Sequence, residues 1–253
     1  MLNVVRGEWY KTRHRSYLYI SIGICCLLAL GLVLMFYLNS SGEGRVRYED
    51  VGRLLLAMLS FGVYFSLIPC DIVFSEEYKH QTMKNSVSHG CSRTSLYLGK
   101  LTVTIAVAML GIGMIVCVLM GSAYLILGVE DAALAGEITA RIWVSLAGAF
   151  PLWTGALCVI NMMSFYCKNS TMMSFAFVGM FMATSLLMVL LGSYVSPFFF
   201  AVRDWMIMPQ FDALQNAERI TGPVLARCYI VGLGYAAVST AVGLLLFHGR
   251  EVK

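Results

Sequence analysis

The feature that most constrains this chain is a set of six long apolar stretches in which charged residues are almost absent. They cover residues 17–38, 54–73, 101–128, 142–166, 172–191 and 229–248. A helix of about 20 apolar residues crosses the roughly 30 Å of hydrocarbon in a bilayer. A chain of 253 residues that is 59% hydrophobic and 13% charged cannot bury that much apolar surface in a soluble fold. The sequence therefore predicts an all-α integral membrane protein with six transmembrane helices in a single domain, residues 1–253.

The basic residues indicate the orientation of these helices. Eleven Lys and Arg residues lie on the side of the two chain ends, and seven lie on the opposite side. Loops rich in Lys and Arg usually stay in the cytoplasm, so both termini are expected there. Asp71 is the one acidic residue within a stretch, and its place near the end of residues 54–73 predicts a position at the membrane interface.

The apolar stretches themselves argue against several functions. An ion-driven carrier usually needs ionisable groups at membrane depth, and these stretches have none in their middle. Four glycines, Gly111, Gly113, Gly155 and Gly179, are expected to allow close helix packing. The eight cysteines form no C-x-x-C pair and predict neither disulfides nor a metal site. Because the chain lacks G-x-x-x-x-G-K-[ST], any nucleotide motor has to be another polypeptide.

Two polar segments on the side of the termini are the places to look for such a partner. Leu2, Val5 and Trp9 recur at helical spacing among charged residues, which predicts a short helix in the headgroup plane. After the second stretch, Ser75 is a candidate N-cap for a helix that starts with Glu76 and Glu77 and ends near Gly90. By composition this second segment suits either a docking helix or an ordinary solvated loop.

The order of several short motifs resembles a known family. Four short motifs follow each other after the second span: the acidic residue Glu77, the polar-Thr pair Gln81-Thr82, the small-residue-Arg step Ser92-Arg93 and the Gly-Lys pair Gly99-Lys100. A Glu-x-x-Lys, here Glu8 and Lys11, precedes the first span. This pattern is similar to that of type 2 ABC exporter permeases, among them the small bacterial permeases of antimicrobial-peptide export and lantibiotic immunity.

The resemblance implies a set of partners and contact residues. A short cytoplasmic coupling helix between spans two and three would dock on a separate ABC ATPase, which holds the ATP and Mg²⁺; its contact residues would be Glu77, Gln81, Thr82, Met83, Asn85, Ser86 and Arg93. An interfacial elbow helix would carry Val5, Glu8, Trp9 and Lys11. A second six-span chain, the same or related, would complete the pathway in a bacterial cell membrane. The chain itself would hold no catalytic residue, cofactor or metal and would bind no nucleic acid.

The segment before the last span is apolar but broken by prolines. It is expected either to form short helices that partly re-enter the outer leaflet or to be an aromatic anchor at the interface. In the first case an outer gate would include Phe199, Arg203, Asp204 and Trp205. The resulting hypothesis is export of an amphiphilic substrate, such as a peptide, that enters from the lipid.

Two other functions stay open at this stage. One is a membrane scaffold or receptor without transport activity. The other is an intramembrane protease, because Glu76-Glu77 lie near His80 and His89. The protease motif that this pair resembles has an arginine where this chain has Gln81, and no apolar stretch supplies a histidine at membrane depth.

Overall fold

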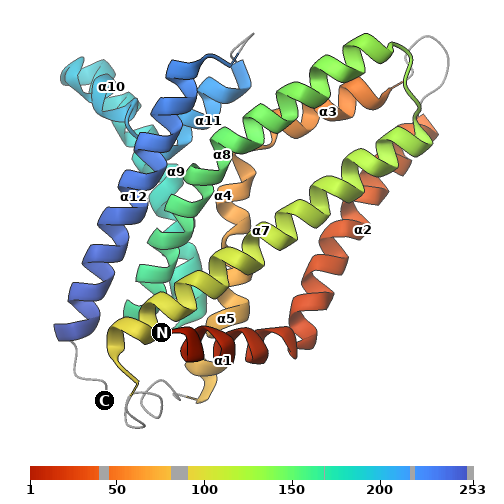
Figure 1. Ribbon diagram of the computed structural model, residues 1–253. Helices are drawn as coiled ribbons and strands as arrows, with labels where there is room; N and C mark the ends of the chain where they lie inside the picture. The colour runs from red at the N-terminus through yellow and green to blue at the C-terminus, as the bar shows by residue number, and fades with distance from the viewer. Residues whose placement is uncertain (40–45, 81–90, 168, 217–219, 250–253) are drawn as a thin grey trace.

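The computed structural model describes residues 1–39, 46–80, 91–167, 169–216 and 220–249, and the regular structure within them is α-helical (Figure 1). The helices are α1 (Leu2–Arg13), α2 (Ser16–Asn39), α3 (Tyr48–Ala57), α4 (Phe61–Phe65), α5 (Leu67–His80), α7 (Arg93–Ile126), α8 (Ala132–Tyr166), α9 (Ser170–Tyr194), α10 (Phe198–Arg203), α11 (Ile207–Asn216) and α12 (Gly222–Gly249). Five of them are long and apolar enough to cross a membrane, and a bent pair makes a sixth candidate span. The predicted all-α integral membrane class is confirmed.

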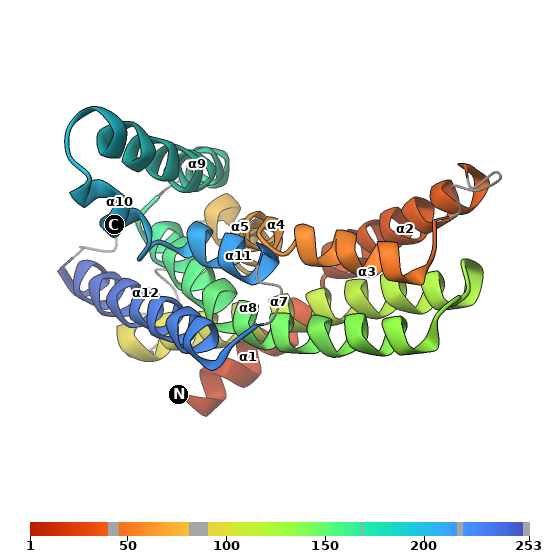
Figure 2. The same cartoon turned by 90° about the horizontal axis from the view of Figure 1, so that it is seen from above.

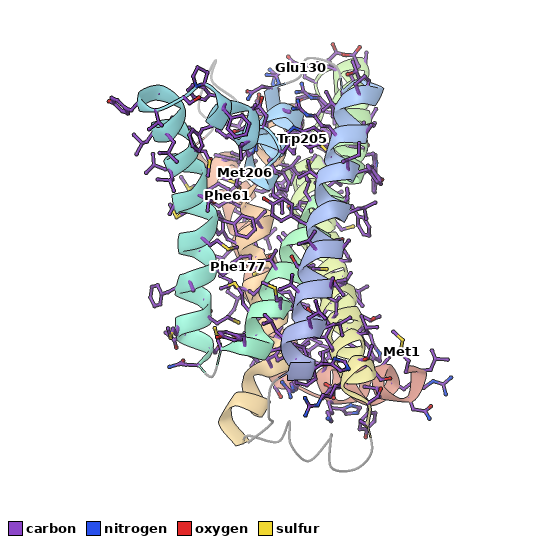
Figure 3. The ribbon with its side chains drawn as sticks, turned by 90° about the vertical axis from the view of Figure 1, so that its left-hand side faces the viewer. Met1, Phe61, Glu130, Phe177, Trp205 and Met206 are labelled. Carbon is purple, nitrogen blue, oxygen red and sulfur yellow. The ribbon has the colours of Figure 1, made fainter. Side chains whose placement is uncertain are left out.

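The N-terminus and the last turn of α12 lie at the same end of the molecule, where α1 also lies (Figure 1). Met1 lies at this end and Glu130, in the turn between α7 and α8, lies at the opposite end (Figure 3). This arrangement agrees with an even number of membrane crossings. The cytoplasmic location of the termini stays a prediction from the basic residues.

The α8 helix lies at the centre of the molecule, as the view from above shows (Figure 2). Of its most apolar window, 67% of the residues are buried, against 28% or less in the other four long helices. Its main partner is α12. A Cβ added at Gly155 would lie 2.8 Å from the Gly232 carbonyl oxygen, and one at Gly232 would lie 2.3 Å from the Pro151 carbonyl carbon. Glycines here let two helices pack backbone against backbone.

Glycine spacing alone does not show which face of a helix meets a neighbour. Gly155 packs closely, as predicted, and a Cβ at Gly111 would make only an ordinary contact with Ile22 at 3.9 Å. For packing within the described part of this chain the prediction is wrong at Gly113 and Gly179, because a Cβ at either position would meet none of the described atoms within 4 Å.

The α7 and α8 helices are longer than their apolar stretches because their N-caps lie outside those stretches. Ser92 accepts a hydrogen bond from the Ser95 amide, and Asp131 accepts from the amides of Ala133 and Leu134. Such caps satisfy amide groups that have no partner within the helix. Gly128, whose φ of 74° suits glycine, lies in the turn between the two helices.

The second span is not the continuous helix that its hydropathy predicts. Tyr48–Ala57 and Phe61–Phe74 meet at an angle of 69°. At the break the backbone turns tightly, with i to i+3 hydrogen bonds from the amides of Phe61 and Gly62 to the carbonyls of Met58 and Leu59. Hydropathy measures only apolar length, so it does not detect a bend whose cause lies in another helix.

Candidate functional site

The end of the molecule that carries both termini is held together by a buried ion pair. There α1 lies across the ends of the spanning helices (Figure 1). Lys100 on α7 donates from Nζ to Oε2 of Glu8 on α1 over 2.8 Å, and Lys11 donates to the other oxygen, Oε1, over 2.9 Å. Lys100 is completely buried and Glu8 is 5% exposed. Glu8 and Lys100, which belong to two of the short motifs of the sequence and are 92 positions apart, thus form one contact.

The residue before Lys100 gives α1 the room to reach α7. A Cβ on Gly99 would lie 2.8 Å from Val4 Cγ1, closer than such atoms pack in proteins. On the same buried side of α1, the Thr12 hydroxyl donates to the Glu8 carbonyl oxygen over 2.8 Å. The Gly-Lys pair therefore contributes both the space and the charge that hold α1.

Electrostatics keep the Glu8 carboxyl ionised. Burial is the largest single influence and by itself raises the pKa of Glu8, but Lys100 and Lys11 together outweigh it and hold that pKa below its ordinary value of 4.5. The Lys100 ammonium also lies 5.0 Å from the centroid of the Phe74 ring on α5, a cation–π contact. We call Glu8, Phe74 and Lys100 the three-helix contact, since one ammonium group of α7 contacts both α1 and α5.

Two further bonds fasten neighbouring helices at this end. Arg15, between α1 and α2, donates through Nη1 to the Ile72 carbonyl oxygen of α5. The Ser170 hydroxyl at the start of α9 donates to Asp71 Oδ1 over 2.7 Å. The second turn of α5 is thus joined to the α1–α2 corner and to α9.

Arg93, predicted to contact a partner, is engaged within the chain. Its Nη1 donates to the carbonyl oxygens of Phe247 over 3.0 Å and His248 over 2.7 Å, and its guanidinium lies 5.9 Å from the Phe247 ring centroid. An arginine in this position satisfies carbonyls at the C-terminal end of a helix, here α12. The first residue of α7 therefore joins α7 to α12.

The other predicted docking residues are placed only in part. The backbone of Glu77 is helical, but it belongs to α5, which runs from Leu67 through Ser75 to His80. The prediction that a new helix starts at Ser75 is therefore wrong, because the span continues past the end of its apolar stretch. Gln81, Thr82, Met83, Asn85 and Ser86 lie outside the described residues, so their role as docking residues stays a prediction.

The expected elbow helix is present as α1, and the side that faces the protein combines apolar residues with one carboxylate: Val4 and Val5 pack against the core, and Glu8 and Thr12 are buried. Val5 is half-buried and Glu8 is buried, whereas Leu2 and Trp9 are 75% and 37% exposed. Lys11 is partly exposed and binds Glu8. The periodicity of Leu2, Val5 and Trp9 correctly predicted a helix, but could not show that Glu8 holds it against α7.

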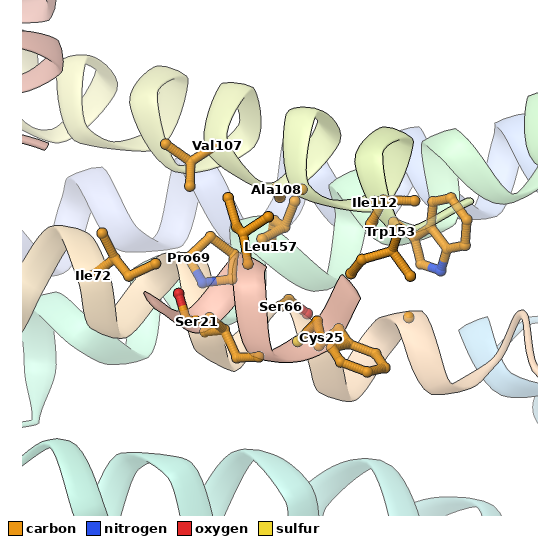
Figure 4. A pocket seen from close by; sticks show the side chains of 16 residues that line it. Ser21, Cys25, Ser66, Pro69, Ile72, Val107, Ala108, Ile112, Trp153 and Leu157 are labelled. Atoms are coloured by element: carbon orange, nitrogen blue, oxygen red, sulfur yellow. The ribbon is translucent and has the colours of Figure 1, made fainter. Parts of the chain in front are cut away.

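A second feature is an apolar cleft at the break in the second span (Figure 4). Two cavities of about 320 Å³ and about 40 Å³ share part of their walls, which come from α2, α4, α7 and α8. The residues common to both are Cys25, Gly62, Phe65, Ile112, Ile115 and Trp153. Ser21 and Ser66 are the hydroxyl residues among the lining side chains. The cleft therefore suits an alkyl chain or an apolar side chain.

One wall of this cleft is fixed by Trp153. Its indole Nε1 donates to the Leu59 carbonyl oxygen over 3.1 Å, so this carbonyl at the break accepts a second hydrogen bond in addition to the one from the Gly62 amide. A Cβ on Gly62 would lie 2.2 Å from the same Nε1. Trp153 therefore contacts both Gly62 and the backbone at the bend. Nothing in the sequence indicated that these residues lie together.

The segment before the last span forms two short helices, α10 and α11, at the end opposite α1 (Figure 1). Phe199 and Arg203 lie on α10, and Arg203 Nη2 is 3.7 Å from Asp212 Oδ2 on α11. Asp204 ends α10, and the Trp205 ring centroid lies 5.4 Å from Arg227 Cζ. The four proposed gate residues are neighbours along the chain, but Arg203 pairs with Asp212 and Trp205 lies against Arg227. Their role as a gate stays a prediction.

The α11 helix reaches inward to the α8 wall of the cleft. Its buried side includes Ile207, Phe211 and Leu214. The Phe211 ring lies 6.3 Å from that of Trp153, and a Cβ on Gly148 of α8 would lie 2.9 Å from Leu214 Cδ2. Protein therefore covers α11, which agrees with the expected short helices between the last two spans.

Comparison with known proteins adds one decisive finding. The profile of the ABC-2 family transporter protein matches residues 4–185, well over half of the chain. The chain belongs to the ABC-2 transporter family. It is therefore a membrane permease component of an ABC transporter, a transport subunit that works with ATPase activity on separate subunits. A comparison with curated proteins found no match. The matched range of this ABC-2 permease holds the three-helix contact and the residues that the two cavities share.

Proposed function

We propose that this ABC-2 permease exports an amphiphilic substrate, a peptide or an antimicrobial compound, that enters the pathway from the lipid through the apolar cleft. The observation that carries the proposal is the position of the cleft. It lies at a bend in a membrane span, and the wall that its two cavities share comes from α2, α4, α7 and α8. A break between two helical segments is a place where a hinge motion can change their relative angle, so such a cleft suits a substrate that must enter and leave.

The proposal includes an assembly. Two six-span chains, identical or related, form the pathway in the cell membrane, and two ATPase subunits dock on the segment that joins α5 to α7. The proposed contacts are Glu77, Gln81, Thr82, Met83, Asn85, Ser86 and Arg93. ATP and Mg²⁺ bind the ATPase subunits. A ligand or motor shifts a conformational equilibrium only through a difference in its binding to the two forms, and the joining segment is where that difference would act.

Filling the cleft tests the proposal. Ile115→Trp places an indole in both cavities, because Ile115 lines each of them. Leu110→Trp is the matched control, since Leu110 lies on the same helix, is 55% exposed and lines neither cavity. The permease would be co-purified with its ATPase, reconstituted in liposomes and assayed for ATP-dependent movement of a fluorescent amphipathic peptide and a fluorescent phospholipid.

We expect Ile115→Trp to lower ATP-dependent movement of the transported probe about tenfold or more, because the side chain occupies the volume that the probe needs. Leu110→Trp should stay within about twofold of the wild type. Equal transport by both variants would show that the substrate does not use this cleft. Failure of the wild type to move either probe with ATP would contradict export of amphiphiles.

A further inference from the structure

The ammonium group of Lys100 lies where three helices meet, and two of these helices lead into the segment that joins α5 to α7. Lys100 is seven residues after Arg93, the first residue of α7, and Phe74 is six residues before His80, the last residue of α5. At 1.5 Å per helical residue, both are about 10 Å from the ends of the segment. The third helix, α1, continues through Arg15 into α2, whose Cys25 lines the cleft.

A buried ion pair is an unusual choice for a contact that only has to be stable. Burying two charges costs solvation free energy, and apolar residues of similar volume are often as stabilising or more so. An ion pair does, however, fix one relative position of its helices, since any other position leaves a buried charge without its partner. The 2.8 Å bond of Lys100 to Glu8, with Phe74 beside it, specifies how α1, α5 and α7 sit against each other.

We propose that Glu8 and Lys100 are positioning residues that make the ends of α1, α5 and α7 move as one body, so that displacement of the joining segment by the ATPase also displaces α2 and the wall of the cleft. The inference rests on the proposed function. It adds a route from the motor to the pathway, in which α1 acts as a protein-bound lever in addition to any contact with lipid.

The geometry offers a covalent substitute for the ion pair. A Cβ on Gly99 would lie 3.5 Å from Val4 Cβ. Cβ atoms of disulfides are about 3.5–4.5 Å apart, so Val4→Cys with Gly99→Cys can join α1 to α7 next to Lys100. Oxidation would close this bond and dithiothreitol would open it, within the same protein sample.

The experiment uses the complete permease with its ATPase in liposomes and measures ATP hydrolysis and peptide-probe transport together. We expect the Lys100→Met complex to assemble and to hydrolyse ATP at a rate within about twofold of the wild type. Transport per ATP should fall about tenfold or more, a change of the size usually found for coupling between two sites. Lys11→Met is the matched control: Lys11 binds the same carboxylate, but its side chain is 54% exposed, and transport per ATP should stay within about twofold of the wild type.

Two further variants separate positioning from stability. The double variant Glu8→Met/Lys100→Met removes the buried charges together, so it should assemble well and still couple poorly. The variant Val4→Cys/Gly99→Cys/Lys100→Met should regain transport per ATP when oxidised and lose it again with dithiothreitol. Normal coupling in Lys100→Met or in the Met/Met variant, or no recovery on oxidation, would overturn the inference.

These outcomes also separate the inference from the proposed function. If the wild type neither binds the ATPase nor moves the probe, the proposed function fails. If the wild type transports the probe and Lys100→Met does so equally well per ATP, only the role of the three-helix contact fails.

Discussion

Lys100 holds its charge in a completely buried position because a carboxylate and an aromatic ring compensate it from two other helices. Burial removes several kcal/mol of solvation free energy from an ammonium group, and without such partners this loss would not be compensated. The contact also depends on Gly99, since only a residue without a Cβ lets Val4 come this close. At the scale of single residues, the fold of this end therefore depends on an adjacent glycine and lysine.

The ion pair makes stability depend on pH. The pKa of Glu8 is lower in the folded protein than its ordinary value of 4.5, so folding favours the ionised form. This contribution is complete above pH 4.5 and is lost as the pH falls through the lowered pKa. In Glu8→Gln the Lys100 charge stays buried without a carboxylate, which typically costs about 3–5 kcal/mol.

We therefore expect Glu8→Gln to melt well below the wild type at neutral pH in detergent, and the difference in Tm to shrink as the pH falls below about 4.5. Lys11→Met should show only a small difference, since that lysine is half exposed. A Tm difference between Glu8→Gln and the wild type that is the same at all pH values would show that the charge of Glu8 does not stabilise the fold.

The sequence singled out Glu8, Lys11 and Lys100 as parts of motifs but could not show that Glu8 binds Lys100. Glu8 and Lys11 are neighbours on one helix face, a relation that helical spacing gives directly. The partner of Glu8 on α7 is 92 residues away, and nothing in the spacing of either motif selects it. Arg93 shows the same limit, because its bonds to the end of α12 arise only when the last helix packs beside the third span.

At the scale of elements, apolar length predicted the spans well where a helix is straight. The predicted 17–38 and 172–191 correspond closely to α2 and α9. It failed at the second span, because the bend there depends on an indole that comes from α8, 94 residues after the carbonyl it binds. The starts of α7 and α8 were also missed, since capping residues outside the apolar stretch extend both helices.

The bend can be tested through Gly62. An added Cβ would lie 2.2 Å from Trp153 Nε1 and 2.6 Å from Trp153 Cε2, so alanine at this position has to move a rigid ring. Moving the ring breaks its bond to the Leu59 carbonyl. We expect Gly62→Ala to cost about 1–3 kcal/mol, or roughly 5 °C in Tm, measured by thermal unfolding in detergent.

Gly179→Ala provides the control for Gly62→Ala, because the same methyl group on α9 would meet no atom of the described residues within 4 Å. It should leave Tm unchanged or raise it slightly, since alanine favours a helix more than glycine does. Equal Tm values for the two variants would mean that the indole does not occupy this place beside the bend.

At the scale of the whole molecule, the two candidate sites lie at different depths and α2 connects them. The three-helix contact joins α1 to α5 and α7 at the end where α1 lies. The cleft lies beside the bend of the second span, and Figure 4 shows the smaller of its two cavities. The central α8 supplies one wall of the cleft and packs backbone against backbone with α12. A shift of α2 against α8 and α12 would change the width of the cleft, and the orientation of the molecule decides whether the ATPase lies at the end that would drive this shift.

That orientation is the last prediction. The end with both termini carries more Lys and Arg, so it should face the cytoplasm. A fluorescent protein fused after Lys253 should fluoresce, and alkaline phosphatase inserted between Glu130 and Asp131, in the turn between α7 and α8, should be active because it folds outside. Alkaline phosphatase inserted between α5 and α7 is the control and should be inactive. The opposite pattern would place the three-helix contact outside, beyond the reach of ATP, and would contradict both the docking proposal and the lever.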